Sequence, residues 1–203
     1  MTARDVPVAL ADKLTAAVGS FGSAFEDVRM DDIARASGIP RATLYYYFAG
    51  KDDVLAFLLG AMLDDLRVSV AIAAEAEGDT HTRLAGVVCA QLAHLAANPA
   101  TGQLLLTNLG RAGRLGVVAA GVEEAFHAPV RRILAEGVRA GVLVGVDVEI
   151  ATTALYGAVT IVGFQALLAD GRIDVDRIAD ALFPIFWWGI ARPRPTRSRR
   201  KKP

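Results

Sequence analysis

One short stretch of the chain combines hydroxyl, aromatic and cationic side chains at close spacing. It reads MDDIARASGIPRATLYYYFAGK and runs from Met30 to Lys51. Tyrosine, threonine, arginine and lysine side chains donate hydrogen bonds to phosphate oxygens, and they also reach base edges in the grooves of duplex DNA. The chemistry that these residue types favour is therefore noncovalent recognition of a nucleic acid.

Two short helices are predicted to position these side chains. Apolar residues at helical spacing predict a helix over Met30–Ser37, and Gly38 ends it because glycine readily adopts the left-handed conformation past a helix end. Pro40 suits the start of a second helix over Arg41–Tyr47. Two short helices joined by a tight turn containing glycine are typical of a helix-turn-helix motif.

The second helix is too short to bury more than one side. At about 100° per residue, Leu44 and Phe48 share a direction that we expect to face the core. Ala42 and Tyr46 then point away from the core. Lys51 begins the next helix, where free N–H groups favour an anion, so it is either a phosphate clamp or part of a capping turn. The residues expected to contact DNA are Arg29, Arg41, Ala42, Thr43, Tyr45, Tyr46, Tyr47 and Lys51.

The stretch from about Leu10 to Leu59 resembles the N-terminal domain of the TetR (tetracycline-repressor) family of transcriptional regulators. The resemblance rests on DDIARASGI followed by TLYYYFAGKDDVL, because TLYxYF with a lysine three residues on is a hallmark of that family. It implies a helical C-terminal domain that dimerises and binds a small-molecule effector. It also implies DNA contacts from Thr43, Tyr46, Tyr47 and Lys51, with Arg41 and Ala42 at positions that vary with the operator.

The chain departs from the family pattern just before the first motif helix. A serine or threonine usually caps that helix, whereas Val28 and Arg29 occupy the region here. Arg29 could contact a phosphate instead, or the cap could fall to Asp27. The preceding loop, SFGSAFEDV, also lacks the usual glycine and is about one residue short.

Composition predicts an all-α fold. The 203 residues are 53% hydrophobic, with short β-branched runs and no strand-like alternation. The net charge is zero, but the segment 192–203 holds seven cations, which leaves 15 basic and 22 acidic residues elsewhere. DNA binding by the motif must then rest on local geometry and few cations, so we expect a modest dependence on salt.

Two helices near the C-terminus are expected to pair with their copies in a homodimer. Ile150–Ala169 has twenty residues without a charge, which is long enough to cross a membrane, but its threonines favour a buried helix. A last helix is predicted over Asp174–Ala191. One face of this helix carries Val175, Ile178, Leu182, Ile185 and Phe186, and Trp187 and Trp188 lie near its end. Together the helices at about 148–170 and 174–191 would form a four-helix interface.

Polar residues in the apolar helices of the C-terminal half are candidates for an effector site. The candidates are Gln91, His94, Asn108, His127, Tyr156 and Gln165. The aliphatic surroundings would suit a largely apolar effector. We found no catalytic motif and no metal-ligand spacing, and we expect no cofactor, no metal and no enzymatic activity. The single cysteine, Cys89, fits a core position in a cytoplasmic protein.

The sequence thus predicts three parts: a helix-turn-helix domain over 6–66 with its motif at 29–48, an effector-binding and dimerisation domain over 67–191, and a disordered basic tail over 192–203. The predicted function is a ligand-responsive repressor that binds a palindromic operator in double-stranded DNA. The alternative is a helical small-molecule-binding module that does not read DNA.

Overall fold

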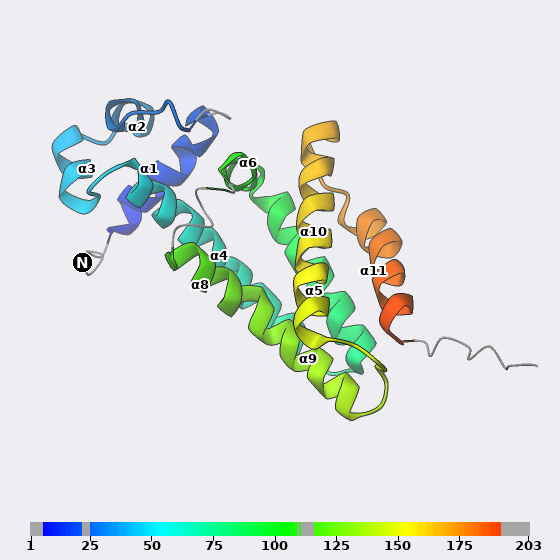
Figure 1. Ribbon diagram of the computed structural model, residues 1–203. Coiled ribbons are helices and arrows are strands. Elements are labelled where there is room, and N and C mark those ends of the chain that lie inside the picture. Colours follow the sequence, from blue (N-terminus) through cyan, green and yellow to red (C-terminus); the bar gives the residue numbers. More distant parts are fainter. Residues whose placement is uncertain (1–5, 22–24, 109, 111–115, 192–203) are drawn as a thin grey trace, which may run out of the picture.

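The structure, a computed structural model, describes residues 6–21, 25–108, 110 and 116–191. These residues form helices and no strands, which confirms the all-α prediction (Figure 1). The predicted tail, 192–203, lies outside the described residues. The elements are α1 (Val8–Ala17), η1 (Val18–Phe21), α2 (Met30–Ser37), α3 (Arg41–Tyr47), α4 (Lys51–Glu75), α5 (Thr80–Ala97), α6 (Pro99–Thr107), α8 (Gly116–Val122), η2 (Glu123–His127), α9 (Ala128–Arg139), α10 (Val148–Asp170) and α11 (Val175–Ala191).

Helices α1, α2 and α3 form a small domain at one end of the molecule (Figure 1). Both motif helices have the predicted bounds. Gly38 ends α2 in the left-handed conformation, with φ of 65°, and its N–H donates to the Ala34 carbonyl. Leu44 and Phe48 are buried against α1, α2 and the start of α4, together with Leu14 and Ile33. The apolar side of α3 is therefore anchored, and its other side remains open.

Helix α4 connects this domain to the larger helical body. It runs unbroken through the predicted domain boundary at residues 66 and 67, and its far half packs along α5. Helix α6 provides a second link, because it contacts η1 at the end of α1. A displacement of α4 or α6 in the body would consequently be transmitted to the motif.

The body contains a π-helical turn just before Pro129. Helices α8 and α9 are joined by η2, a π-helical segment in which the N–H of Ala128 donates to the carbonyl of Glu123. Pro129 follows directly and has no N–H to donate, so a regular α-helical ladder cannot pass through it. Arg131 holds the turn from outside, 2.8 Å from Glu123 and 2.6 Å from Glu149 of α10.

The apolar face that the sequence indicates for α11 lies partly in the core and partly on the surface of the subunit. Ile185 is 75% exposed, whereas the side chains buried against the body are Ile178, Ala179, Phe183 and Trp187. Both sides of this helix are apolar, so the position of α5, on which α11 packs, decided which side became core. The exposed side carries Ile185 and Trp188.

Helix α10 also has an apolar exposed side. Its length and hydropathy alone would allow it to cross a membrane, but 44% of its most apolar window is buried within the subunit. Gly163 permits a close approach to α5, since a Cβ there would lie 2.9 Å from a methyl of Leu95. Ile161 and Leu168 are exposed, and Gly157 has open space beside it.

Candidate nucleic-acid interface and effector site

The outer face of α3 consists of Arg41, Ala42, Thr43, Tyr45, Tyr46 and Tyr47. Its centre is exposed, whereas Tyr47 at its edge is half-buried and packs against the core. Tyr46 is 59% exposed and touches the edge of the Tyr47 ring, with the ring centroids 4.9 Å apart. Tyr45 is also exposed, whereas Thr43 is half-buried. The orientation deduced from the helical period is thus the one that the structure has, and DNA contact by these residues stays a prediction.

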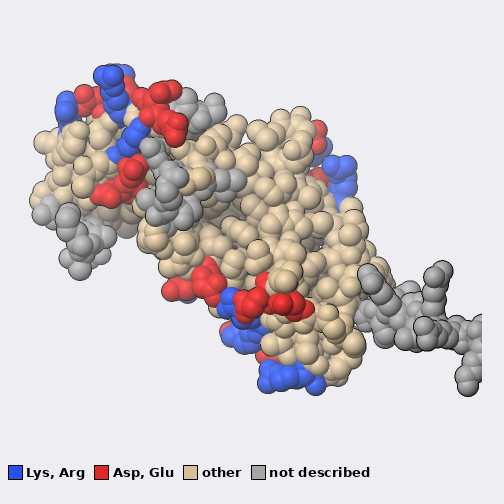
Figure 2. Space-filling model, viewed as in Figure 1, with Lys and Arg blue, Asp and Glu red and all other residues tan. Residues whose placement is uncertain are grey.

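Arg41 is held by two neighbours on this face. Its Nη1 lies 2.9 Å from the carboxylate of Asp31, in the first turn of α2. Its guanidinium also lies 5.4 Å from the centroid of the Tyr45 ring. Figure 2 shows basic and acidic side chains next to one another at this end of the molecule. The interface therefore offers oriented hydrogen-bond donors and no large positive patch.

Lys51 has an internal role that its sequence position does not reveal. Its ammonium donates to the backbone carbonyls of Phe25 and Glu26, in the segment before α2. These bonds tie the start of α4 to that segment. A phosphate contact by Lys51 would have to share or replace the two bonds, and it too stays a prediction.

The first motif helix takes its cap from Asp32, a residue that the sequence did not indicate for this role. Arg29 is the N-cap residue, and the Asp32 carboxylate accepts a hydrogen bond from the Arg29 backbone N–H at 3.0 Å. The cap does not fall to Asp27. Because the capping bond uses only the backbone of Arg29, the exposed guanidinium can also contact a phosphate.

A shallow groove of about 260 Å³ runs between the start of α1 and α3. Lys13 lines it together with Thr43, Pro40 and Tyr47. Lys13 was missed as a candidate, since only the packing of α1 against the motif brings this cation beside the outer face of α3. A duplex that contacts α3 would place its backbone within reach of Lys13.

In the body, four polar residues from three elements form a chain that we call the polar seam: His127, Tyr156, Thr160 and Gln91. Gln91 Nε2 donates to Thr160 Oγ1 at 2.7 Å, and Tyr156 hydrogen bonds with Thr160 on the same helix. The ring centroids of His127 and Tyr156 are 5.1 Å apart. Burial raises the pKa of the Tyr156 hydroxyl, and its bond with Thr160 opposes this.

The polar seam has hydrogen-bonding capacity that its neighbours do not use. Gln91 Oε1 and His127 Nε2 are buried without a hydrogen-bond partner in the described part of the chain. His94 Nε2, one turn from Gln91 on α5, is in the same condition. Burial lowers the pKa of His94, while the charge of Asp65 and a hydrogen bond to the Met62 backbone oppose this. Buried polar atoms without a hydrogen-bond partner lower the stability of the fold. Binding of a ligand that supplied the missing partners would therefore be favourable.

The other two predicted effector residues lie elsewhere. Asn108 is buried, but its amide donates to the Leu104 carbonyl and to Thr107. These bonds give Asn108 a structural role at the C-terminal end of α6. Gln165 is exposed on α10. The structure thus brings His127, Tyr156 and Gln91 together, with His94 adjacent, and leaves Asn108 and Gln165 apart from them.

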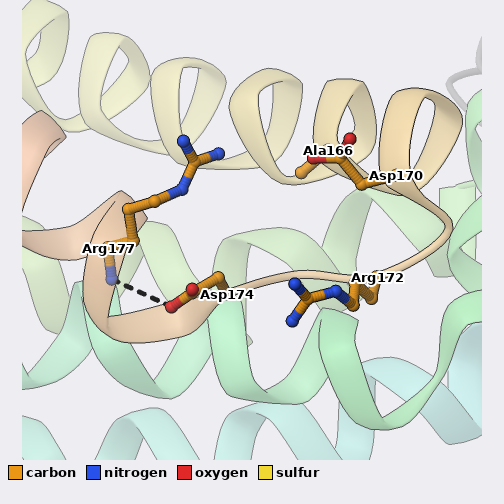
Figure 3. Close-up of a pocket in the computed structure, with 5 residues that line it drawn as sticks. All are labelled: Ala166, Asp170, Arg172, Asp174 and Arg177. Carbon is orange, nitrogen blue, oxygen red and sulfur yellow. Dashed lines mark hydrogen bonds between the residues drawn. The ribbon is translucent and has the colours of Figure 1, made fainter.

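A hollow at the other end of α10 is a separate feature. It has a volume of about 490 Å³ and lies at the turn between α10 and α11 (Figure 3). Its lining residues are Ala166, Asp170, Arg172, Asp174 and Arg177. The Asp174 carboxylate accepts from the Arg177 backbone N–H at 3.2 Å, which caps α11. This open and charged hollow contains none of the predicted effector residues.

Comparison with known proteins assigns the N-terminal domain. Residues 14–57 match the family described as bacterial regulatory proteins, tetR family. Over 54 residues the chain is 37% identical to the HTH-type transcriptional regulator EthR of Mycobacterium tuberculosis. That match covers 27% of this chain and 25% of EthR, so it spans about a quarter of the curated relative's length.

Two solved structures share the fold of nearly the whole chain. The fatty acid degradation regulator FadR from Bacillus halodurans superposes with a TM-score of 0.76 at 18% identity, over 91% of this chain and 96% of that one. FadR from Bacillus subtilis in complex with stearoyl-CoA gives 0.75 at 19%, over 90% and 98%. The matched proteins are regulators and not enzymes. The family match over residues 14–57 assigns the helix-turn-helix domain to the tetR type, and the shared fold extends the likeness over nearly the whole chain, which supports a transcriptional regulator of the TetR family.

Proposed function

We propose that this protein is a sequence-specific DNA-binding regulator of transcription, and that it is a repressor released from its operator by a small molecule. The outer face of α3 carries this proposal. On that face Tyr45 and Tyr46 stand in solvent while Leu44 and Phe48 anchor the helix from behind. Exposed aromatic hydroxyls on a short helix suit the major groove, where they reach phosphates and base edges.

The protein binds DNA as a homodimer, so that two copies of α3 enter successive major grooves about 34 Å apart. Support comes from the apolar side that α10 and α11 leave uncovered in one subunit. We call it the α10–α11 surface, and its exposed members are Ile161, Leu168, Ile185 and Trp188. Several large apolar side chains exposed on two neighbouring helices are typical of a protein–protein interface. Two-fold pairing would bury this surface and favour a near-palindromic operator.

The effector binds in the body and uses the polar seam. The unpaired atoms of Gln91 and His127 support this site, because they would bond to a polar group of a ligand otherwise surrounded by aliphatic side chains. The stearoyl-CoA bound to the structurally similar FadR supports an effector with a long apolar part. A ligand in the closed seam must displace helices, and α4 and α6 connect those helices to the motif. Such a ligand weakens DNA binding by favouring another motif spacing.

A gel shift tests DNA binding directly. Purified protein is titrated into duplexes tiled across the intergenic DNA that flanks its own gene, with competitor DNA of random sequence. We expect one fragment to be retained at nanomolar protein, and footprinting of that fragment to show two protected half-sites. Equal binding to every fragment would contradict sequence-specific recognition. Absence of binding to any fragment would favour the second candidate.

That second candidate is a helical ligand-binding module without DNA reading. Its support is the charge of the motif region, where Arg41 is paired with Asp31 and Lys51 with backbone carbonyls. Thermal shift with a panel of fatty acyl, lipophilic neutral and small charged compounds tests the shared part of both candidates. A response to apolar compounds is expected. A response confined to the small charged compounds would refute an apolar effector.

A further inference from the structure

One ion pair joins the two helices of the motif at its outer face. Asp31 lies in the first turn of α2, and Arg41 is the first residue of α3. The carboxylate and Nη1 are 2.9 Å apart, although the two residues are ten positions apart in the chain. Both side chains remain largely in solvent, with 48% and 63% of their surfaces exposed.

The pair orients Arg41 without covering it. The guanidinium is held on one side by the carboxylate and on another by the Tyr45 ring, 5.4 Å away. Arginine presents five N–H donors, and a carboxylate that binds at Nη1 leaves most of them available. Arginine with a free pair of donors makes bidentate bonds to O6 and N7 of guanine in the major groove. A guanidinium fixed in advance loses less conformational entropy when it makes those bonds.

Stability does not account for Asp31. Ion pairs exposed to this degree contribute little to folding, because solvent screens them and two long side chains must be ordered. A carboxylate beside DNA also repels phosphates, which is unfavourable for simple affinity. The neighbouring Asp32 differs, because it accepts from the Arg29 backbone N–H and pairs with Arg35 at 3.1 Å. Arg41 is the partner that the structure shows for Asp31.

We propose that Asp31 is a positioning residue for base recognition: it aims Arg41 at a guanine of the operator and lowers affinity for DNA that lacks that guanine. This inference rests on the proposed function, since it requires that α3 read a duplex. It assigns to a negatively charged residue a role in specificity that a search for cations would overlook. Loss of its charge strengthens binding to random DNA while discrimination at one base pair declines.

In vitro selection from a pool of random duplexes tests this, and it does not require that the operator sequence be known. Selections are run with the wild-type chain, Arg41→Ala, Asp31→Asn and Asp64→Asn. The last variant is a matched control, because it removes one exposed charge on α4 that pairs only loosely with Arg67, at 3.9 Å. Thermal unfolding of each variant checks the fold. Binding of the selected and random duplexes is then measured at low and high salt.

We expect Arg41→Ala to abolish a guanine preference at one position of each half-site. Asp31→Asn should weaken the preference at that same position by about five- to tenfold, because a bidentate arginine contact gives at least that discrimination. Its affinity for random duplexes should increase roughly two- to fivefold at low salt, and the gain should shrink as salt screens the charge. Asp64→Asn should reproduce the wild-type sequence preference.

Other results would overturn the inference in distinguishable ways. An Asp31→Asn selection identical to that of the wild type, or a uniform loss at every position, would show that Asp31 does not aim Arg41. A change at a position that Arg41→Ala leaves untouched would do the same. If the wild-type chain enriched no sequence at all, the proposed function would fail, and this inference with it.

Discussion

Helices α3 and α10 leave opposite kinds of surface uncovered. On α3 the apolar side chains Leu44 and Phe48 are buried, and Tyr45 and Tyr46 face solvent. On α10 the hydroxyl of Thr160 is buried in the polar seam, whereas Ile161 and Leu168 face solvent. Polar outer groups favour a hydrated and charged partner, and apolar outer groups favour a partner that excludes water. The difference supports the two partners proposed above: DNA at α3 and a second copy at α10 and α11.

The largest effect is expected from a charge placed on the α10–α11 surface. Ile185→Asp alters a side chain that is 75% exposed in one subunit, so the subunit should fold. In a dimer the carboxylate would be buried without a partner, and we expect dimerisation to weaken about 100-fold or more. Sedimentation equilibrium measures the dissociation constant, and a gel shift should show specific DNA binding lost in parallel. An unchanged association constant would place the dimer interface elsewhere.

Ile72→Asp is the matched control, because it places the same charge at an exposed isoleucine elsewhere on the subunit. Ile72 is similarly exposed but lies on α4, outside the α10–α11 surface. It should leave both dimerisation and DNA binding near wild-type values.

Tyr46→Ala tests the opposite surface. Tyr46 points outward, so its loss should leave the thermal midpoint within a few degrees of the wild-type value. Specific DNA affinity should fall about tenfold or more, because the side chain's contacts with phosphates and bases are removed. Gel-shift titration and thermal unfolding of the same samples provide both measurements. A large fall in thermal midpoint with little change in affinity would mean that Tyr46 supports the domain and not the complex.

Lys51→Ala should affect binding and stability together. The variant leaves the Phe25 and Glu26 carbonyls without their ammonium donor, and we expect a loss of about 1 kcal/mol or more of stability. Binding to all DNA sequences should weaken alike, and the slope of log affinity against log salt should flatten by about one unit. A stability loss with an unchanged salt slope would restrict Lys51 to its structural role. A changed sequence preference would contradict a phosphate contact.

The polar seam should matter more for ligand response than for folding. Because Gln91 Oε1 already lacks a partner, replacing both bonded residues in Gln91→Leu/Thr160→Val should change the free energy of unfolding by less than ~1 kcal/mol. The variant should nevertheless lose the thermal shift given by compounds that stabilise the wild-type chain. Leu92→Ala, a buried aliphatic neighbour on α5, should instead cost about 2–5 kcal/mol in denaturant unfolding. If the double variant kept the wild-type thermal shift with these compounds, the polar seam would not be part of the effector site.

The smallest expected effect is a pH dependence from His94. Burial holds its pKa in the folded protein below the unfolded value. The unfolded chain then binds more protons between the two pKa values, so stability is full above about pH 6.5 and declines as the pH falls below it. Denaturant unfolding at several pH values from about 7.5 to about 5.5 should show this slope, and His94→Gln should flatten it. Equal slopes in the two proteins would contradict the assignment.

Prediction from sequence succeeded where a local signal decides the structure. Gly38 and Pro40 mark the turn of the motif, and the bounds of α2 and α3 follow from these two residues and the apolar spacing. It did not decide which side of α11 packs on the body, because apolar residues surround this helix and periodicity cannot choose between two apolar sides. The internal bonds of Lys51 were also missed, since they depend on the path of the segment before α2. The cap of α2 was missed although it spans three residues, because Arg29 and Asp32 do not form the usual pattern of serine or threonine followed by glutamate.

By itself the sequence determined the helical fold class, the position and orientation of α3, and the family resemblance. These rest on residues that are a few positions apart in the chain. A helix holds the side chains of such residues at fixed angles, whatever surrounds it. Only the tertiary structure decided that Arg41 meets Asp31, that Gln91 meets Thr160 69 positions away, and that one side of α10 and α11 remains uncovered. Those outcomes depend on how whole helices pack, and packing selects among faces that the sequence leaves equally apolar.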